Sequence, residues 1–275
     1  MSGTPQSQNS VPLSIGLINA TSINGYASNV RIVNGTAVYS GTTYTVPTAP
    51  LTAITNTSLL LNFTNAGIYD ATSKNDLETV GNAQISTTQS KWGGSSMYFD
   101  GNGDYLTAPS TILEQFGTAN FTIEFWFYKA ANGAFNYGDS TGDFILRIGN
   151  AGFTTNSIVI STNNSQQITA FIGYNGSSWA TTIVSSSTFS LNTWYYCALV
   201  RAGTGANQTA LYVNGTSYGT ATNSTNLTDA SFGTVLRLGA SGSDRYFNGY
   251  LQDFRITNGY ARTVTTTPTA AFPTL

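Results

Sequence analysis

Three aromatic side chains in polar loops are the residues of this sequence whose type and surroundings best suit chemistry. Tyr137 lies in the Gly-rich stretch ANGAFNYGDSTGD at 131–143, while Tyr174 and Trp179 lie in GYNGSSW at 173–179. Aromatic rings stack on the apolar faces of sugars, and neighbouring amides and carboxylates bond the sugar hydroxyls. The three residues are therefore candidates for a glycan-binding site. The alternative is that the same rings pack in the core or against another subunit.

Few side chains in this sequence could perform acid–base or thiol chemistry. The 275 residues include no histidine, which removes the commonest general base and the usual zinc ligand. Cys197, the one cysteine, stands in the apolar stretch WYYCALV, so we expect a buried hydrophobe rather than a reactive thiol. The 10 basic and 12 acidic residues are scattered singly. No basic run is available to neutralise phosphates, so nucleic-acid binding is not expected.

The elements that must position these loops are β-strands. Only 8% of residues are charged and 13% are aromatic, whereas about a quarter are charged in an ordinary soluble domain. Short apolar runs alternate with Gly and Asn turns, the pattern of an antiparallel sandwich. The expected strands are 59–63, 96–100, 121–128, 143–149, 157–161, 167–174, 194–201, 209–214, 217–221, 234–239 and 249–257.

The stretch FTIEFWFY at 121–128 is apolar on both of its faces. One face is expected to carry Phe121, Ile123, Phe125 and Phe127, and the other Trp126 and Tyr128. A strand that is covered on both sides belongs in the middle of a large sandwich.

One segment of the chain occurs twice. GYLQDFRITNGYAR at 249–262 repeats GYASNVRIVNGTAV at 25–38, and both copies lead into a Thr/Pro tail, TPTAAF at 267–272 and VPTAPL at 46–51. The match covers only part of the chain, so it marks a duplicated segment rather than two whole domains. The later copy reads as a half-buried strand that ends in an Asn-Gly turn.

The N-terminal part differs in composition from the rest. Residues 1–10 are polar, as in an unstructured arm. They show no signal-peptide pattern, and no stretch reaches the roughly 20 apolar residues of a membrane span. We expect three segments: an arm at 1–24, the early copy with its Thr/Pro link at 25–57, and a sandwich at 58–275.

Four phrases in order carry a resemblance to a known family. They are MYFDGNGDYLTAP at 97–109, FTIEFWFY at 121–128, WYYCALVRAGTGANQTALYVNGTSYGTA at 194–221 and LRLGASGSDRYFNGYLQDFRI at 236–256. This succession resembles the laminin-G-like, concanavalin-A-like jelly rolls over roughly residues 58–275. The repeated tail phrase resembles the junction between consecutive modules of this family in bacteriophage virion proteins. The resemblance implies an all-β, antiparallel jelly-roll sandwich preceded by an N-terminal arm and an orphan strand.

The resemblance also implies a calcium ion near the first and last strands. Asp253 is the matching carboxylate on the last strand, with Asp100, Asn102 and Asp104 on the FDGNGDY turn as further ligands. Calcium takes about six to eight oxygens, from carboxylates, amides and carbonyls. The early copy has Asn29 at the position of Asp253, a poorer ligand. The alternative is that Asp100 and Asp104 accept hydrogen bonds from their own turn.

Catalysis by the related glycoside hydrolases would need two carboxylates about 5–9.5 Å apart. Glu124 stands alone in its strand, Glu114 has no acidic neighbour, and Asp139 and Asp143 lie in or beside the Gly-rich loop. A Ser triad is excluded because there is no histidine. We therefore expect no enzymatic activity.

The resemblance favours a non-enzymatic structural protein on the exterior of a phage particle, such as a capsid decoration protein present in several copies. Residues 1–58, with the arm and the orphan strand, would dock it to other virion proteins or to its own copies. No heptads or shaft repeats indicate a fibre. The alternative is a glycan-binding adhesin or tail-fibre receptor-binding protein, whose loops bind host surface glycans.

Overall fold

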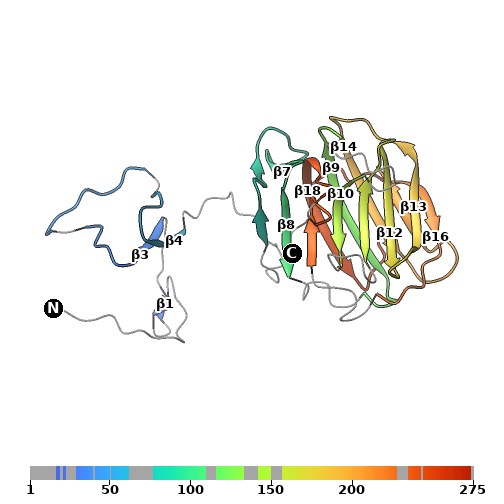
Figure 1. Cartoon of the computed structure of the whole chain (residues 1–275), viewed down its shortest axis with the longest axis horizontal. Coiled ribbons are helices and arrows are strands. Elements are labelled where there is room, and N and C mark those ends of the chain that lie inside the picture. Colours follow the sequence, from blue (N-terminus) through green and yellow to red (C-terminus); the bar gives the residue numbers. More distant parts are fainter. Residues whose placement is uncertain are drawn as a thin grey trace. The chain divides into compact units, whose positions relative to one another are not determined.

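The computed structural model describes the chain at residues 17–18, 21–22, 29–39, 41–49, 51–61, 77–109, 116–132, 142–149, 157–227, 235–242 and 244–273. The chain divides into two compact units, Met1–Gly67 and Ile68–Leu275. The second unit contains two seven-stranded antiparallel sheets (Figure 1). This architecture confirms the predicted antiparallel jelly-roll sandwich. Among the described residues, no helix is long and apolar enough to cross a membrane.

Each sheet is named here by its central strand. The β10 sheet has the order β13 (Trp179–Thr188), β12 (Gln167–Tyr174), β11 (Ile158–Thr162), β10 (Asp143–Ile148), β17 (Val235–Leu238), β8 (Tyr105–Pro109) and β5 (Glu78–Val80). The β9 sheet has the order β16 (Thr216–Ala221), β15 (Thr209–Val213), β14 (Trp194–Arg201), β9 (Phe121–Lys129), β18 (Asn248–Asn258), β7 (Ser96–Asp100) and β6 (Gln84–Ser86).

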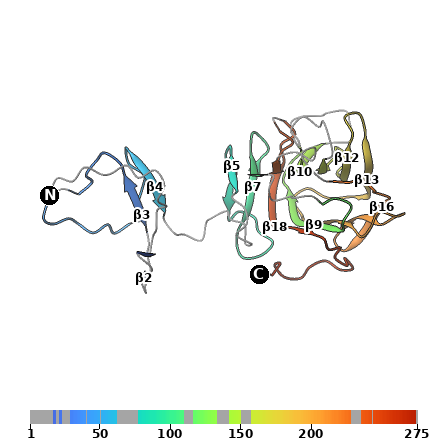
Figure 2. The same cartoon turned by 90° about the horizontal axis from the view of Figure 1, so that it is seen from below.

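The core lies between the two sheets, which Figure 2 shows as two layers. Both sheets contribute alternate residues, because successive side chains of a strand point to opposite faces. Phe125 and Phe127 of β9 meet Ile145 and Ile148 of β10 in one apolar cluster, and all four are fully buried. Cys197 lies in the same cluster, and burial raises the pKa of its thiol. It is the inert hydrophobe that the sequence predicted.

Strand β9 is central in its sheet, as the sequence predicted for residues 121–128. It pairs with β14 on one side and with β18 on the other. Its phenylalanines and Ile123 face the core, while Glu124 and Trp126 point outward and are also buried. The outer face of this sheet is therefore covered in part, and not simply solvated.

The C-terminal tail after β18 supplies that cover (red in Figure 2). Val264 and Phe272 of the tail pack on an outer cluster that contains Trp126, Tyr196 and Val200. Burial of these rings holds the tail against the sheet.

The N-terminal unit contains two small sheets. Strands β1 (Leu17–Ile18) and β2 (Thr21–Ser22) form one, and β3 (Val30–Val33) and β4 (Thr57–Leu61) form the other. The sequence analysis assigned residues 59–63 to the sandwich, but β4 instead pairs with β3. The orphan strand therefore has a partner within its own unit.

The two sheets approach each other closely at Gly239, and a substitution there tests this contact. Gly239, after β17, has φ +95, and a Cβ there would lie 2.5 Å from the ring of Phe99 on β7. Gly259 has φ +80 and no atom within 4 Å of such a Cβ. We predict that Gly259→Ala lowers the free energy of unfolding by about 1 kcal/mol through its backbone alone. Gly239→Ala should cost about 1–3 kcal/mol more through overpacking.

Urea denaturation of the two purified variants beside the parent chain measures both losses. Equal losses would contradict the close contact between Gly239 and Phe99.

Candidate functional site

A row of four aromatic side chains crosses the outer face of the β9 sheet. Tyr98 on β7, Tyr250 on β18, Tyr128 on β9 and Trp194 on β14 are direct cross-strand partners. We call these four residues the aromatic row. Since neighbouring strands lie about 4.8 Å apart, the row spans about 14 Å.

The rings of the aromatic row contact one another along its length. The centroid distances are 4.9 Å for Tyr98–Tyr250, 5.6 Å for Tyr250–Tyr128 and 5.6 Å for Tyr128–Trp194. Three of the rings are half-buried and Tyr250 is buried, so the row presents ring surface while its packing holds each ring in place. Burial raises the pKa of Tyr98, helped by Tyr250 and Asp100, so its hydroxyl stays protonated at neutral pH.

Buried indole N–H groups gather on the same face. Among the described residues, the Nε1 atoms of Trp92, Trp126 and Trp194 have no hydrogen-bond acceptor. A buried donor without a protein partner is uncommon and is usually satisfied by an ordered water. These three N–H groups lie beneath the surface of the outer face, so the rings themselves are what this face presents.

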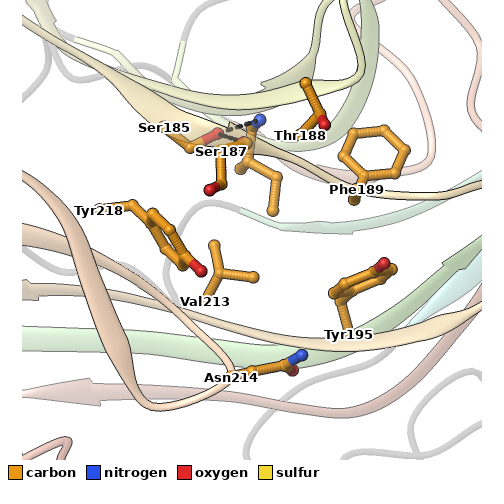
Figure 3. A pocket seen from close by; sticks show the side chains of 9 residues that line it. Ser185, Ser187, Thr188, Phe189, Tyr195, Val213, Asn214 and Tyr218 are labelled. Carbon is orange, nitrogen blue, oxygen red and sulfur yellow. Dashed lines mark hydrogen bonds between the residues drawn. The ribbon is translucent and has the colours of Figure 1, made fainter.

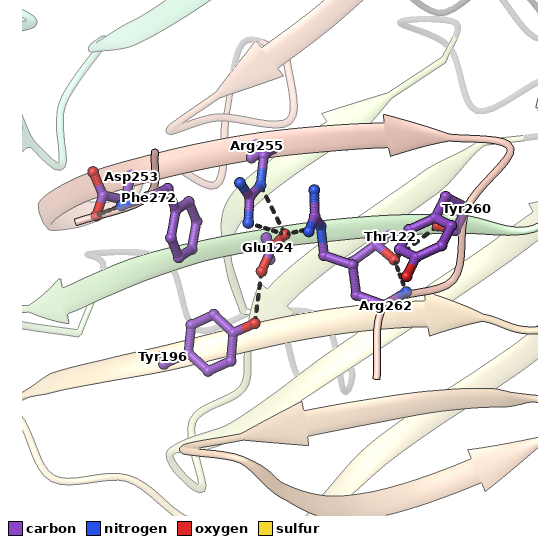
Figure 4. A network of polar contacts seen from close by, with 8 residues as sticks. All are labelled: Thr122, Glu124, Tyr196, Asp253, Arg255, Tyr260, Arg262 and Phe272. Carbon is purple, nitrogen blue, oxygen red and sulfur yellow. Dashed lines mark hydrogen bonds and ion pairs between the residues drawn. The ribbon is translucent and has the colours of Figure 1, made fainter. Parts of the chain in front are cut away.

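A buried carboxylate on the outer face, four residues before Tyr128 in β9, joins neighbouring strands (Figure 4). Glu124 accepts a hydrogen bond from the hydroxyl of Tyr196 at 2.7 Å and from Nε of Arg255 at 2.9 Å. Arg262, in the C-terminal tail, forms an ion pair with the same carboxylate at 2.9 Å. Burial, and then the bond to Glu124, raise the pKa of Tyr196. The network ties β9, β14, β18 and the tail together.

Asp253 accepts a hydrogen bond from the C-terminal tail near its end. It lies where the pairing of β18 with β9 shifts register, at φ 52, and its Oδ2 accepts the amide of Phe272 at 3.1 Å (Figure 4). Asn29 in the early copy has φ 55, and its Oδ1 accepts the amide of Leu51 at 3.3 Å. Leu51 and Phe272 occupy the same position of the repeated tail phrase. The duplicated segment therefore keeps its conformation and its tail bond in both copies.

The four predicted calcium ligands do not form one group. Asp104 is buried and accepts the backbone amides of Asn82 and Asp100, and Asp100 accepts the amide of Asn102 at 2.7 Å. Burial raises the pKa of Asp104, while those two amides lower it. The bonds from Asp100 and Asn102 match the alternative role as acceptors within the turn, while the bond from Asn82 joins the turn to another segment.

Asp253 lies away from that turn. Asn248 is the residue of β18 that pairs with Asp100. Asp253 is therefore about 16 Å further along the strand at about 3.3 Å per residue. No cluster of three His, Cys, Asp or Glu side chains occurs in the part of the chain that the structure describes. A calcium site that uses all four predicted ligands does not fit this arrangement.

Two of the three predicted glycan-binding residues lie together on the β10 sheet. Tyr174 and Trp179 are cross-strand partners at the end of the β12–β13 hairpin, with ring centroids 5.0 Å apart. Trp179 also packs on Phe171, at 5.3 Å, in a small cluster with Phe144. Both rings are half-buried, so the structure combines packing with partial exposure. Tyr137 lies outside the described residues.

The described pocket is too small for a sugar ring. It has a volume of about 40 Å³ and lies between β13 and the strands β14 and β15 (Figure 3). Phe189, Tyr195 and Tyr218 supply most of its apolar lining, and Ser185 and Asn214 supply polar groups. A volume of this size holds a water molecule or two. A sugar ring therefore does not fit in this pocket.

The predicted acidic residues do not form a catalytic pair among the described residues. Glu124 is engaged by Arg255 and Arg262, and Asp143 pairs with the buried Lys129 at 2.7 Å. Burial lowers the pKa of Lys129, and Asp143 opposes that shift. Glu114 and Asp139 lie outside the described residues.

Comparison with known proteins identifies related chains by family and by fold. The family model of the concanavalin A-like lectin/glucanases superfamily matches residues 100–266. No curated protein matches the chain in sequence.

Solved structures of similar fold include the receptor binding domain of botulinum neurotoxin C/D mosaic serotype (13% identity, TM-score 0.50, 74% of this chain and 46% of that one). Another is the binding domain of Paraclostridial Mosquitocidal Protein 1, with 17% identity and a TM-score of 0.50 over 70% of this chain and 46% of that one. A third is domain 4 of the arabinanase AbnA from Geobacillus stearothermophilus, in complex with arabinotriose (14%, 0.49, 69% and 84%). The chain spans about half the length of the two toxin domains.

The tail bond of Asp253 predicts opposite results for two substitutions. Burial raises the pKa of Asp253, which means that the fold disfavours its charge. Asp253→Asn should therefore keep or raise the free energy of unfolding, as the natural Asn29 indicates. Asp253→Ala should lower it by about 1 kcal/mol, because the amide of Phe272 loses its acceptor.

The raised pKa of Asp253 also predicts how the free energy of unfolding changes with pH. Because the folded-state pKa of Asp253 lies above the ordinary 3.8, this group's contribution to stability falls as the pH rises through that pKa. The loss should be absent from Asp253→Asn. Denaturation at several pH values and hydrogen exchange at Phe272 measure both effects. An Asn variant as unstable as the Ala variant would refute the shared role of Asn29 and Asp253.

Proposed function

Because the chain belongs to the concanavalin A-like lectin/glucanases superfamily, we propose that it is a non-enzymatic carbohydrate-binding protein. The observation that carries this proposal is the aromatic row, in which Tyr98, Tyr250, Tyr128 and Trp194 stand in register across four adjacent strands. The proposed ligand is a polysaccharide segment that lies along this row.

The chemistry of the row suits sugars better than it suits purely apolar ligands. Each ring offers apolar surface for the C–H face of a sugar, and the tyrosine hydroxyls both donate and accept hydrogen bonds. A row about 14 Å long accommodates several linked sugar rings rather than one.

Rigidity of the rings adds to this argument. Cross-strand contacts hold the four rings at both ends and in the middle, and the neighbouring Glu124 network fixes β9 and β18. A surface that is already ordered loses little side-chain entropy when it binds.

Binding without catalysis is the second part of the proposal. Hydrolysis would require two carboxylates about 5–9.5 Å apart that flank the bound sugar. Three of the described carboxylates have other partners: Glu124 is bound by two arginines, Asp104 accepts two amides and Asp100 accepts the amide of Asn102. The toxin receptor binding domain of similar fold is compatible with a sandwich used for binding.

Substitution in the aromatic row tests the carbohydrate proposal. The full chain is screened on an array of neutral and acidic polysaccharides, and its affinity for the best ligand is measured by calorimetry. Trp194→Ala and Tyr98→Ala should each weaken binding about tenfold, which corresponds to about 1.4 kcal/mol of lost ring contact. Trp179→Ala, on the opposite sheet, is the matched control and should bind normally. No sugar should be cleaved.

The control separates the two candidate surfaces. Binding lost in Trp179→Ala and kept in Trp194→Ala would place the ligand at the β12–β13 hairpin and refute the row. An empty array would refute carbohydrate binding, and reducing ends released from a glucan would refute the non-enzymatic role.

A place on the exterior of a bacteriophage particle is a second proposal, favoured by the duplicated segment. Asn29 and Asp253 show that the N-terminal unit repeats the end of the sandwich, as expected of a modular virion protein. Within this proposal, residues 1–58 attach the molecule to virion proteins and the sandwich faces outward.

Deletion of residues 1–51 tests the attachment. We predict a chain whose sandwich still folds, because Ile68–Leu275 is a compact unit of its own. This chain should no longer bind to particles in a co-sedimentation assay. Circular dichroism provides the folding control, and a truncated chain that still binds particles would exclude attachment through this segment.

A further inference from the structure

Exposed apolar side chains concentrate in the N-terminal unit. Eight large hydrophobic residues are exposed among the described residues, and six of them belong to this unit: Ile32, Val38, Tyr39, Tyr44, Val46 and Ile54. An exposed group of this kind marks a surface that a partner covers.

The later copy of the segment indicates how such a strand is normally covered. Ile256, which corresponds to Ile32, packs against the core of the sandwich. Ile32 has the same place in its strand but is 38% exposed. The early copy therefore has the side chains of a covered strand, while in the described part of its own unit it pairs with β4 alone.

The β3–β4 sheet also has open edges. Each of its strands has one neighbour in the described part of the unit, and a sheet of two strands is marginal in water without further strands or cover. Neither strand contains Pro or Lys, the residues that commonly protect an edge from pairing. Residues 29–61 carry one charge, that of Arg31.

We propose that two copies of this chain pair through their β3 edges. Antiparallel pairing about a two-fold axis would join the two sheets into one four-stranded sheet, in the order β4–β3–β3–β4. The partner is a second copy because a surface with so little charge offers no complement to a charged partner and does not repel itself. The two edges are identical in sequence, as an isologous contact requires.

The side chains distinguish the two registers that are centred on the middle residues of β3. In an antiparallel pair, opposite residues share a face, so the two-fold axis must pass through a residue position. An axis at Arg31 would place two guanidinium groups opposite each other, which is unfavourable. An axis at Ile32 places Ile32 opposite its own copy and Arg31 opposite Val33. The second register covers the exposed isoleucine and separates the charges.

Pairing would give each assembly two sandwiches and two aromatic rows. Two linked sites on one polysaccharide raise avidity without a new contact. The pairing itself does not depend on the proposed carbohydrate binding, since it concerns the other unit and can be measured without any sugar.

Sedimentation velocity of the full chain over a range of concentrations tests the pairing. We expect a monomer–dimer equilibrium in the parent chain and a dissociation constant at least about 100-fold higher in Ile32→Lys, where two ammonium groups would oppose each other. Val184→Lys is the matched control, since Val184 is 39% exposed and lies in the sandwich. This control should dimerise as the parent does.

A crosslink tests the register. Residues opposite each other in antiparallel strands have Cα atoms about 4.5–5.5 Å apart, within reach of a disulfide. Ile32→Cys should form a disulfide-linked dimer under mild oxidation and Val184→Cys should not, while Cys197 is fully buried and adds little background. A parent chain that is monomeric throughout, or an Ile32→Lys chain that dimerises normally, would overturn the proposal. Equal crosslinking of both Cys variants would exclude the register.

Discussion

The burial of β9 on both faces is the constraint on which the sandwich depends. Its phenylalanines fill the space between the sheets, so its polar and large amphipathic side chains must point outward. Glu124 is then buried outside the core, where it needs the partners that Tyr196, Arg255 and Arg262 supply. That need fixes β14, β18 and the tail around β9. Three rings of the aromatic row, Tyr98, Tyr128 and Trp194, remain partly exposed on this outer face.

The two copies of the duplicated segment show which features of its conformation need the sandwich and which do not. Its left-handed residue and the bond from that residue to the tail occur at Asn29 without a sandwich and at Asp253 within one. The left-handed backbone is therefore a local preference, since Asn and Asp adopt positive φ more readily than other residues with a side chain. The bond between Asn29 and Leu51, by contrast, spans 22 residues. What differs is the cover: the β18 copy has the core beneath it, and the β3 copy has β4 beside it.

The strands with strong apolar patterns were predictable from sequence, and those with polar inner faces were not. Strands β7, β12 and β14 lie at the predicted residues, because each is rich in aromatic or β-branched side chains. In β13 the buried positions are Thr181, Ile183 and Ser185, so one apolar residue between two polar ones gives only a weak signal on its inward face. Strands β5 and β6 have three residues each, too few for a period to be visible. The aromatic row was missed because register, not sequence proximity, brings its four rings together.

The central claim is that polysaccharide lies on the outer face of the β9 sheet, and side-chain NMR is its most direct measurement. With the Tyr and Trp rings isotopically labelled, a binding polysaccharide is titrated into the full chain. The account predicts that the ring resonances of Tyr98, Tyr128, Trp194 and Tyr250 shift together with one dissociation constant. Shifts confined to Tyr174 and Trp179, with the four rings unchanged, would contradict it.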